Sequence, residues 1–260
     1  GEGYRWDNIG AMVNRGVEVS VNSDIIRTKD FTWNLNANVS YNKNKLVELY
    51  NGVQEYVNST TGLKFVVGHP VHEFFLNRYA GVNPANGDAL WYTKDGELTT
   101  EFNESDKVMT GKTFDSPWAG GFGTTFAWKG LSLSAQFSWM ADRWVMNNDR
   151  FFEESNGLYS AYNQSRRLLY DRWKKPGDIT DRFLENSSFL RLKNLTLAYA
   201  LPQTLLKKTN FFTSARVYLQ GQNLLTFTGF TGLDPEMSSN IYRAQYPASR
   251  QFTLGIEVSF

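Results

Sequence analysis

The closing stretch of this chain, QFTLGIEVSF (residues 251–260), decides the fold. Side chains of an extended strand point to alternate faces, so its apolar residues share one face, and polar residues or glycine occupy the other. The apolar set is Phe252, Leu254, Ile256, Val258 and Phe260. A soluble sheet could use this face against a core, but the stretch closes on an aromatic residue with no polar tail. We therefore expect the apolar face to meet lipid.

This ending resembles the last strand of outer-membrane β-barrels, which implies that the same five residues close a barrel and carry its assembly signal. The composition agrees: the chain has 260 residues, of which 41% are hydrophobic and 15% aromatic, and its mean hydropathy is −0.44. No uncharged apolar run reaches the ~18 residues of a membrane helix. Barrel strands need no such run, because only every second side chain faces lipid.

Charge and cysteine content exclude several functions. The formal net charge is +1 with scattered Lys and Arg, so no nucleic-acid partner is indicated. The chain has no cysteine and hence neither disulfides nor thiolate chemistry. His69 and His72 would point to opposite faces of a strand, which argues against a shared metal site. We expect no cofactor, although Asp234 and Glu236 could offer oxygens to a structural calcium ion.

An enzyme is not expected. The acidic pairs at 153–154 and 234–236 have neither a recognisable acid/base spacing nor a histidine or serine partner. They are typical of solvated acids in loops.

Alternating apolar and polar residues predict an all-β chain of nine antiparallel strands. The expected strands are 16–27, 31–41, 71–80, 88–93, 118–128, 131–139, 189–201, 211–222 and 251–260. A change of phase within 189–201 predicts a β-bulge near Lys193 and Asn194. Within 142–186, aromatic, leucine and arginine residues recur at steps of three and four and predict a short helix before Pro176.

The lengths of the connections alternate. Long loops are expected at 42–70, 94–117, 142–186 and 223–247, and short turns at 28–30, 81–87, 129–130 and 202–210. Bacterial barrels place long loops outside the cell and short turns in the periplasm. Every connection falls on the correct side, and a soluble sandwich has no reason to sort lengths in this way. The pattern therefore predicts a transmembrane barrel with long extracellular loops.

Nine strands do not close a barrel alone, because single-chain bacterial barrels have even numbers and an open edge cannot face lipid. We expect residues 1–260 to be the C-terminal part of a larger, 22-stranded barrel with a plugged lumen. The opening residues read like mid-protein sequence rather than a signal peptide, so we expect either that a signal peptide lies upstream or that the chain is a fragment.

Several motifs in register resemble SusC/RagA-type TonB-dependent transporters of Bacteroidota. They are NRGVE (14–18), DII (24–26), FTW (31–33), YAGVNP (79–84) with GD (87–88), GGFGTTF (120–126), SFLRLKNLTL (188–197), GQNLLTF (221–227), GLDPE (232–236), and YP (246–247) with SR (249–250). The resemblance covers nearly the whole chain, but the signal peptide, TonB box and plug domain of the family are not in it.

The resemblance implies active import of glycans or peptides across the outer membrane of a Gram-negative bacterium. The implied partners are TonB, acting through the missing N-terminal region, a SusD-like lipoprotein on the extracellular face, and the lipid bilayer. Two alternatives stay open: a passive outer-membrane barrel, and a soluble β-sandwich that binds carbohydrate.

The third external loop is the richest candidate for contacts to substrate or lid. Its aromatic residues could stack on sugar rings or pack against a partner, although packing against neighbouring loops is the commoner role. They are Trp144, Phe151, Phe152, Tyr159, Tyr162 and Trp173. The arginines of the same loop would suit acidic groups equally well. These are Arg143, Arg150, Arg166, Arg167 and Arg172.

Overall fold

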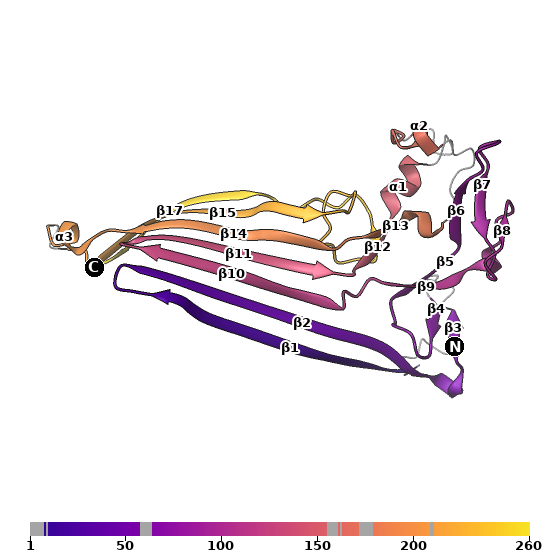
Figure 1. The fold of residues 1–260 in the computed structure, drawn as a ribbon, viewed down its shortest axis with the longest axis horizontal. Coiled ribbons are helices and arrows are strands. Elements are labelled where there is room, and N and C mark those ends of the chain that lie inside the picture. Colours follow the sequence, from indigo (N-terminus) through magenta and orange to yellow (C-terminus); the bar gives the residue numbers. More distant parts are fainter. Residues whose placement is uncertain are drawn as a thin grey trace, which may run out of the picture.

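The computed structural model describes Asn8 and residues 10–57, 64–154, 161, 163–171, 179–208 and 211–260. Within these residues, seven long strands form one antiparallel sheet in the order β1-β2-β10-β11-β14-β15-β17 (Figure 1). They are β1 (Gly10–Arg27), β2 (Phe31–Leu49), β10 (Trp118–Trp128), β11 (Leu131–Ala141), β14 (Phe189–Ala200), β15 (Ser214–Thr228) and β17 (Gln251–Ser259). Across the described ranges, no helix is long and apolar enough to cross a membrane.

Short connections lie at one end of the sheet, here named the turn end. The β14–β15 connection there carries helix α3 (Gln203–Leu206), and the C-terminus lies at the same end (Figure 1). In the β10–β11 hairpin, Lys129 and Gly130 have φ angles of 47° and 89°. Two successive residues with positive φ make the type I′ turn, whose twist suits a two-residue hairpin.

The long connections gather at the opposite end, here named the loop end, and form small sheets and short helices (Figure 1). The first carries η1 (Tyr50–Gly52), β3 (Glu55–Val57), β4 (Lys64–Val66), β5 (Glu73–Leu76), β6 (Arg78–Val82), β7 (Ala89–Tyr92), β8 (Leu98–Thr99), η2 (Glu104–Asp106) and β9 (Val108–Thr113). The second carries β12 (Trp144–Asn147), α1 (Asn148–Glu153), α2 (Leu168–Asp171), η3 (Asp181–Phe183) and β13 (Leu184–Asn186), and the third carries β16 (Ile241–Tyr242).

The all-β architecture is as expected, but the sheet has seven long strands rather than nine. The segments expected as strands 71–80 and 88–93 form β5, β6 and β7, which belong to the small sheets β5-β9 and β6-β7-β8. None of the three exceeds five residues, whereas a strand that crosses the hydrocarbon needs about 9–11. Two expected loops therefore merge into the connection 50–117. The turn at 81–87, expected on the periplasmic side, joins β6 to β7 at the loop end instead, and the remaining connections still alternate in length.

The other seven expected strands are confirmed, with shifted ends. β1, β2 and β15 extend further toward the loop end than the alternation indicated. The bulge near Lys193 is confirmed, because the register of β14 with β15 shifts between Leu192 and Asn194. The predicted helix before Pro176 is present as the short α2, and the remainder of that prediction lies outside the described residues.

The two faces of the large sheet differ in chemistry along whole rows of paired residues. One row reads Ile26, Trp33, Phe126, Leu133, Leu197, Leu219 and Leu254. The row on the opposite face reads Asp24, Asn34, Thr125, Ser134, Thr196, Gln220 and Thr253. The apolar face is open to its surroundings: Leu254 is 75% exposed and Ile256 is 70% exposed. An uncovered apolar face of this size is typical of the lipid-facing side of a barrel wall.

Aromatic side chains border the apolar face at both ends. Near the turn end, Trp33 stacks on Phe126 with ring centroids 5.6 Å apart. Toward the loop end, Tyr41 meets Trp118 at 4.6 Å. From Phe31 to Tyr41 the strand rises about 34 Å, which a tilt of ~40° reduces to about 26 Å across a membrane. This height matches the apolar band of about 25 Å in outer-membrane barrels.

The main buried apolar clusters lie at the loop end rather than beneath the sheet. One cluster joins Phe74, Leu76, Met146, Phe183 and Leu184. A second joins Val145, Phe230, Met237 and Tyr242. Because their members come from all three long connections, the connections form one packed assembly at the loop end.

Candidate functional site at the loop end

A small three-stranded sheet supports the candidate site. β12 pairs antiparallel with β13 and parallel with β16, so the second and third long connections are joined by backbone hydrogen bonds. Asn147 ends β12 and caps α1, because its side chain accepts a hydrogen bond from the Arg150 backbone N–H at 3.3 Å. The cap fixes the direction in which α1 presents Arg150 and the residues that follow.

A fully buried carboxylate, Glu154, lies at the centre of the charge network. It binds Arg150 through two hydrogen bonds of 3.0 Å. It also accepts from Arg167 at 3.0 Å and from Arg182 at 3.2 Å. Burial by itself would raise the pKa of Glu154, but the hydrogen bonds from Arg150 and Arg167 and the charge of Arg182 outweigh it, so the pKa is lowered. The carboxylate is therefore ionised and joins three segments of the loop.

A second carboxylate, Glu185 on β13, links the same network to the third long connection. It accepts from Arg150 at 2.8 Å and from Asn147 at 3.2 Å. Its other oxygen accepts from the Thr231 backbone N–H at 2.9 Å. The side chain of Arg150 thus lies between two carboxylates, those of Glu154 after α1 and Glu185 on β13.

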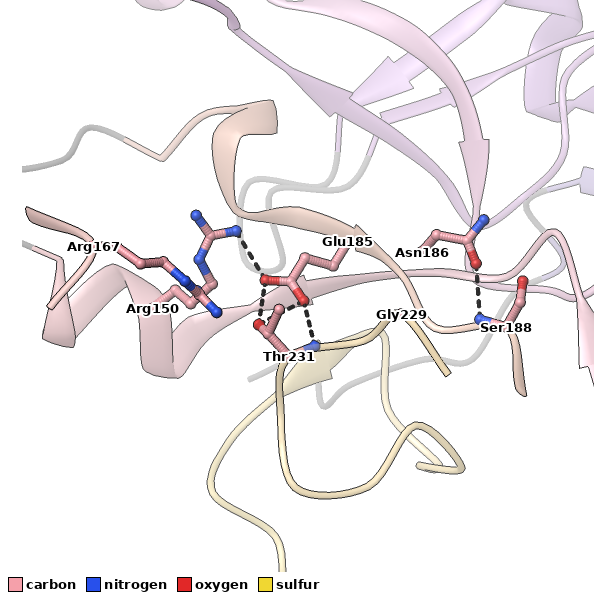
Figure 2. A pocket seen from close by; sticks show the side chains of 7 residues that line it. All are labelled: Arg150, Arg167, Glu185, Asn186, Ser188, Gly229 and Thr231. Carbon is pink, nitrogen blue, oxygen red and sulfur yellow. Dashed lines mark hydrogen bonds and ion pairs between the residues drawn. The ribbon is translucent and has the colours of Figure 1, made fainter. Parts of the chain in front are cut away.

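Part of this network lines a pocket of about 450 Å³, shown in Figure 2. Its lining is Arg150, Arg167, Glu185, Asn186, Ser188, Gly229 and Thr231. Glu185 is turned toward Arg150 and Thr231, and the Asn186 side chain accepts from the Ser188 backbone N–H at the other side of the pocket (Figure 2). The Arg167 side chain is 45% exposed, against 10% for Glu185. The charge that the pocket presents to solvent is therefore mainly cationic.

A further ionic cluster pins the third long connection to the large sheet. Arg191 on β14 is 3% exposed and donates to Asp234 at 2.5 Å and to Glu236 at 2.9 Å. The other oxygen of Asp234 accepts from the Ala248 backbone N–H at 2.8 Å. Burial would raise the pKa of Asp234, but the hydrogen bonds from Arg191, Ala248 and the Glu236 backbone lower it overall. Asp234 therefore joins two parts of the third long connection and attaches this connection to β14 of the large sheet.

Arg143 strengthens this attachment from the second connection. It is buried and donates to the backbone carbonyl of Pro235 at 2.8 Å and to that of Met237. Desolvation lowers the pKa of the Arg143 guanidinium. The motif GLDPE therefore lies where arginines from two other segments converge.

The structure brings three of the predicted aromatic contacts together. Trp144 and Phe151 pack against the cluster around Phe183, and Phe151 meets Phe152 edge-on at 5.3 Å. Lys112 lies 4.1 Å from the centre of the Trp144 ring. Tyr159, Tyr162 and Trp173 lie outside the described residues, as does Arg172. The expectation that the acids at 153–154 and 234–236 are solvated is wrong for two of them, because Glu154 is fully buried and Asp234 is 7% exposed, each paired with arginine. Sequence reasoning could not find these pairs or the role of Glu185 and Thr231, because no local pattern links such distant positions.

The two histidines are engaged separately. His69 lies 2.8 Å from Glu73, and His72 lies 2.8 Å from Asp115. The hydrogen bond to Asp115 raises the pKa of His72, against a smaller lowering by burial. Each histidine therefore ties one stretch of the first long connection to a carboxylate.

Comparison with known proteins assigns the fold to a family. TonB-dependent receptor P3 of Formosa agariphila is 30% identical over 298 residues, covering 97% of this chain and 29% of that protein. TonB-dependent receptor SusC of Bacteroides thetaiotaomicron is 29% identical over 276 residues, covering 97% of this chain and 27% of that protein. The chain thus spans less than a third of the length of these relatives.

A solved structure agrees in three dimensions. The RagAB peptide transporter superimposes with a TM-score of 0.92 at 35% identity, over 97% of this chain and 30% of that one. No protein-family model matches the chain. Likeness in both sequence and structure over nearly its whole length shows that this chain is part of the β-barrel of a SusC/RagA-type TonB-dependent receptor.

Proposed function

We propose that the chain forms wall and external loops of an outer-membrane transporter that imports peptides or glycans, is energised by TonB, and works with a SusD-like surface lipoprotein. The observation that carries the proposal is the two-faced sheet, with an exposed apolar face about 26 Å high and a polar face behind it. The likeness to receptors of this type and to a peptide transporter supports it.

In this arrangement the loop end faces the outside and the polar face lines the lumen. The pocket beside Arg167 and the aromatic group of Trp144, Phe151 and Phe152 offer contacts to a ligand or to the lid. The ionic clusters around Glu154 and Asp234 hold these loops in place, so contacts with a ligand need not order them first.

Whole-cell uptake by the full-length receptor tests the proposal. Fluorescent peptide and oligosaccharide pools would be offered to cells with the receptor, without it, and with the receptor but without TonB. We expect uptake of one pool that requires both the receptor and TonB, and copurification of a surface lipoprotein with the receptor in detergent. Receptor-dependent uptake that persists without TonB would instead indicate a passive barrel. Recovery of the folded receptor from the aqueous phase without detergent would contradict the membrane placement.

A further inference from the structure

Three cationic side chains project from the outer, apolar face of the sheet just above its aromatic border. In the register of β1 with β2, Arg15 lies opposite Lys43, and Val13 lies opposite Lys45. The next rung toward the turn end pairs Val17 with Tyr41. Because alternate residues share a face, these cations continue the lipid-facing column and do not point into the lumen.

The three cations line a groove outside the barrel wall. Its volume is about 330 Å³, and its lining is Val13, Arg15, Lys43, Lys45 and Val47. All three cationic side chains are exposed. The groove thus combines positive charge with two apolar side chains, a composition that suits the boundary between headgroups and hydrocarbon.

The height of the groove can be derived from the strand. Tyr41, whose ring packs against that of Trp118, marks the upper edge of the apolar band. Lys43 lies two residues beyond Tyr41, about 7 Å along the strand, or roughly 5 Å in height at a tilt of ~40°. Lys45 lies roughly 10 Å above Tyr41 by the same reasoning. Because the headgroup layer of one leaflet is about 5–7 Å thick, the backbone of Lys43 and Arg15 lies within it, and that of Lys45 lies about 3 Å beyond it, within reach of a lysine side chain.

The charge of the groove is not balanced within the described part of the chain. Among those residues, no ion pair joins Arg15, Lys43 or Lys45 to an acid. Like charges directly opposite each other on neighbouring strands destabilise the pair. Arg15 opposite Lys43 is therefore unfavourable unless an anion lies between them.

We propose that this groove binds the phosphorylated headgroup of lipid A, the glycolipid of the outer leaflet. Arg15 offers a planar fork to phosphate oxygens and the two lysines offer point charges. The cations occupy two successive rungs of one face, about 7 Å apart, which suits a headgroup with more than one anionic group. The inference rests on the proposed membrane placement, but not on transport, because the groove lies on the face opposite the lumen.

Lipid binding by the full-length receptor tests the inference. The receptor would be purified in an uncharged detergent and titrated with bisphosphorylated lipid A, with the same lipid A after removal of its phosphates, and with phosphatidylethanolamine. The test variant combines Arg15→Gln, Lys43→Gln and Lys45→Gln. The control variant removes three cations elsewhere at the loop end, by Lys94→Gln, Lys107→Gln and Arg243→Gln; Lys94 and Arg243 are exposed, and the Lys107 side chain is 26% exposed and pairs with Glu104.

We expect the native receptor to prefer bisphosphorylated lipid A over both other lipids. Each cation near an anionic headgroup contributes about fivefold in affinity, so the test variant should bind roughly 100-fold more weakly, and the control variant should bind like the native receptor. Without lipid, the test variant should be at least as stable as the native receptor, because the opposed charges are gone, whereas a purely structural role would make it less stable.

Three results would overturn the inference. The first is equal binding of phosphorylated and dephosphorylated lipid A by the native receptor. The second is an unchanged preference for phosphorylated lipid in the test variant, which would place the site elsewhere. The third is binding of phosphatidylethanolamine as tightly as bisphosphorylated lipid A, which would make the glycolipid assignment wrong. The proposed transport is judged separately by uptake, which the test variant should retain.

Discussion

The Glu154→Gln substitution tests whether the loop end is held together by one buried carboxylate. Glu154 joins three arginines from three segments and is fully buried, while Arg182 is 4% exposed and Arg150 is 18% exposed at their side chains. Glutamine keeps the shape and one accepting oxygen but removes the charge. Three guanidinium groups then share a site in which Glu185, the second partner of Arg150, remains as a counter-charge.

The magnitude follows from burial. Removing one partner of a buried ion pair costs about 3–5 kcal/mol. The pair with Arg167 contributes little to this, because the Arg167 side chain is 45% exposed and water screens it. The retained oxygen offsets part of the loss, so we expect about 3 kcal/mol, which corresponds to roughly a 150-fold change in the opening equilibrium of the loop.

Hydrogen exchange on the full-length receptor in detergent measures this opening. We expect α1 and residues 163–171 to exchange about 100-fold faster in Glu154→Gln, and the strands of the large sheet to exchange as in the native protein. The matched control is Glu104→Gln, whose partner Lys107 lies at 2.7 Å but whose side chain is 77% exposed. The control should change exchange by less than threefold. Unchanged protection of α1 in Glu154→Gln would refute the argument.

Three further outcomes are expected. Leu35→Arg, midway along the apolar column of β2, should destabilise the barrel by about 2–4 kcal/mol, whereas Asn36→Arg on the polar face should be nearly neutral. Reversible unfolding in lipid measures the free energy of unfolding of both variants, and equal losses would contradict the assignment of the two faces. Asp234→Asn should destabilise the attachment of the loop 229–250 to the large sheet by about 3 kcal/mol, because the buried Arg191 loses a counter-charge. Faster proteolysis within that loop is the expected readout. Native-like resistance to proteolysis would contradict the role given to the contact between Asp234 and Arg191. Because Asp115 raises the pKa of His72, the contact between them stabilises the first long connection fully below the ordinary pKa of 6.5, and this contribution is lost as pH rises through the folded pKa. His72→Ala should abolish the pH dependence of hydrogen exchange in this connection. An identical pH profile in the variant would exclude the histidine as its source.

The sequence determined the sheet because each wall strand carries its own signal. Lipid on one side and polar lumen on the other impose an alternation that can be read residue by residue, as in 31–41 and 251–260. The Lys129–Gly130 turn and the bulge near Lys193 are likewise local, since backbone conformation and phase decide them. Predicting these features therefore required no information about contacts between residues that are distant in the sequence.

The same local signal misled where strands are short. Segments 71–80 and 88–93 are predicted as wall strands, although the phase of 71–80 is ambiguous, yet Trp91 and Ala89 are buried in a cluster with Phe102 at the loop end. Alternation reports that one side of a strand is buried, and it does not report whether lipid or protein covers that side. The length of an unbroken strand distinguishes the two, and that length is fixed by its neighbours.

The candidate site belongs wholly to tertiary structure. The sequence showed that arginines and aromatic residues gather in one loop, but the partners of Arg150 lie 4 and 35 positions away, and Arg191 meets Asp234 across 43 positions. Contacts over such separations depend on how three long connections pack together, which no local periodicity encodes. The sequence by itself determined a barrel wall and the end of the sheet at which the long loops gather, because the solvent next to each strand residue selects its polarity. Only the packing of the loops decided which charges meet, because burial makes one carboxylate the shared partner of several arginines.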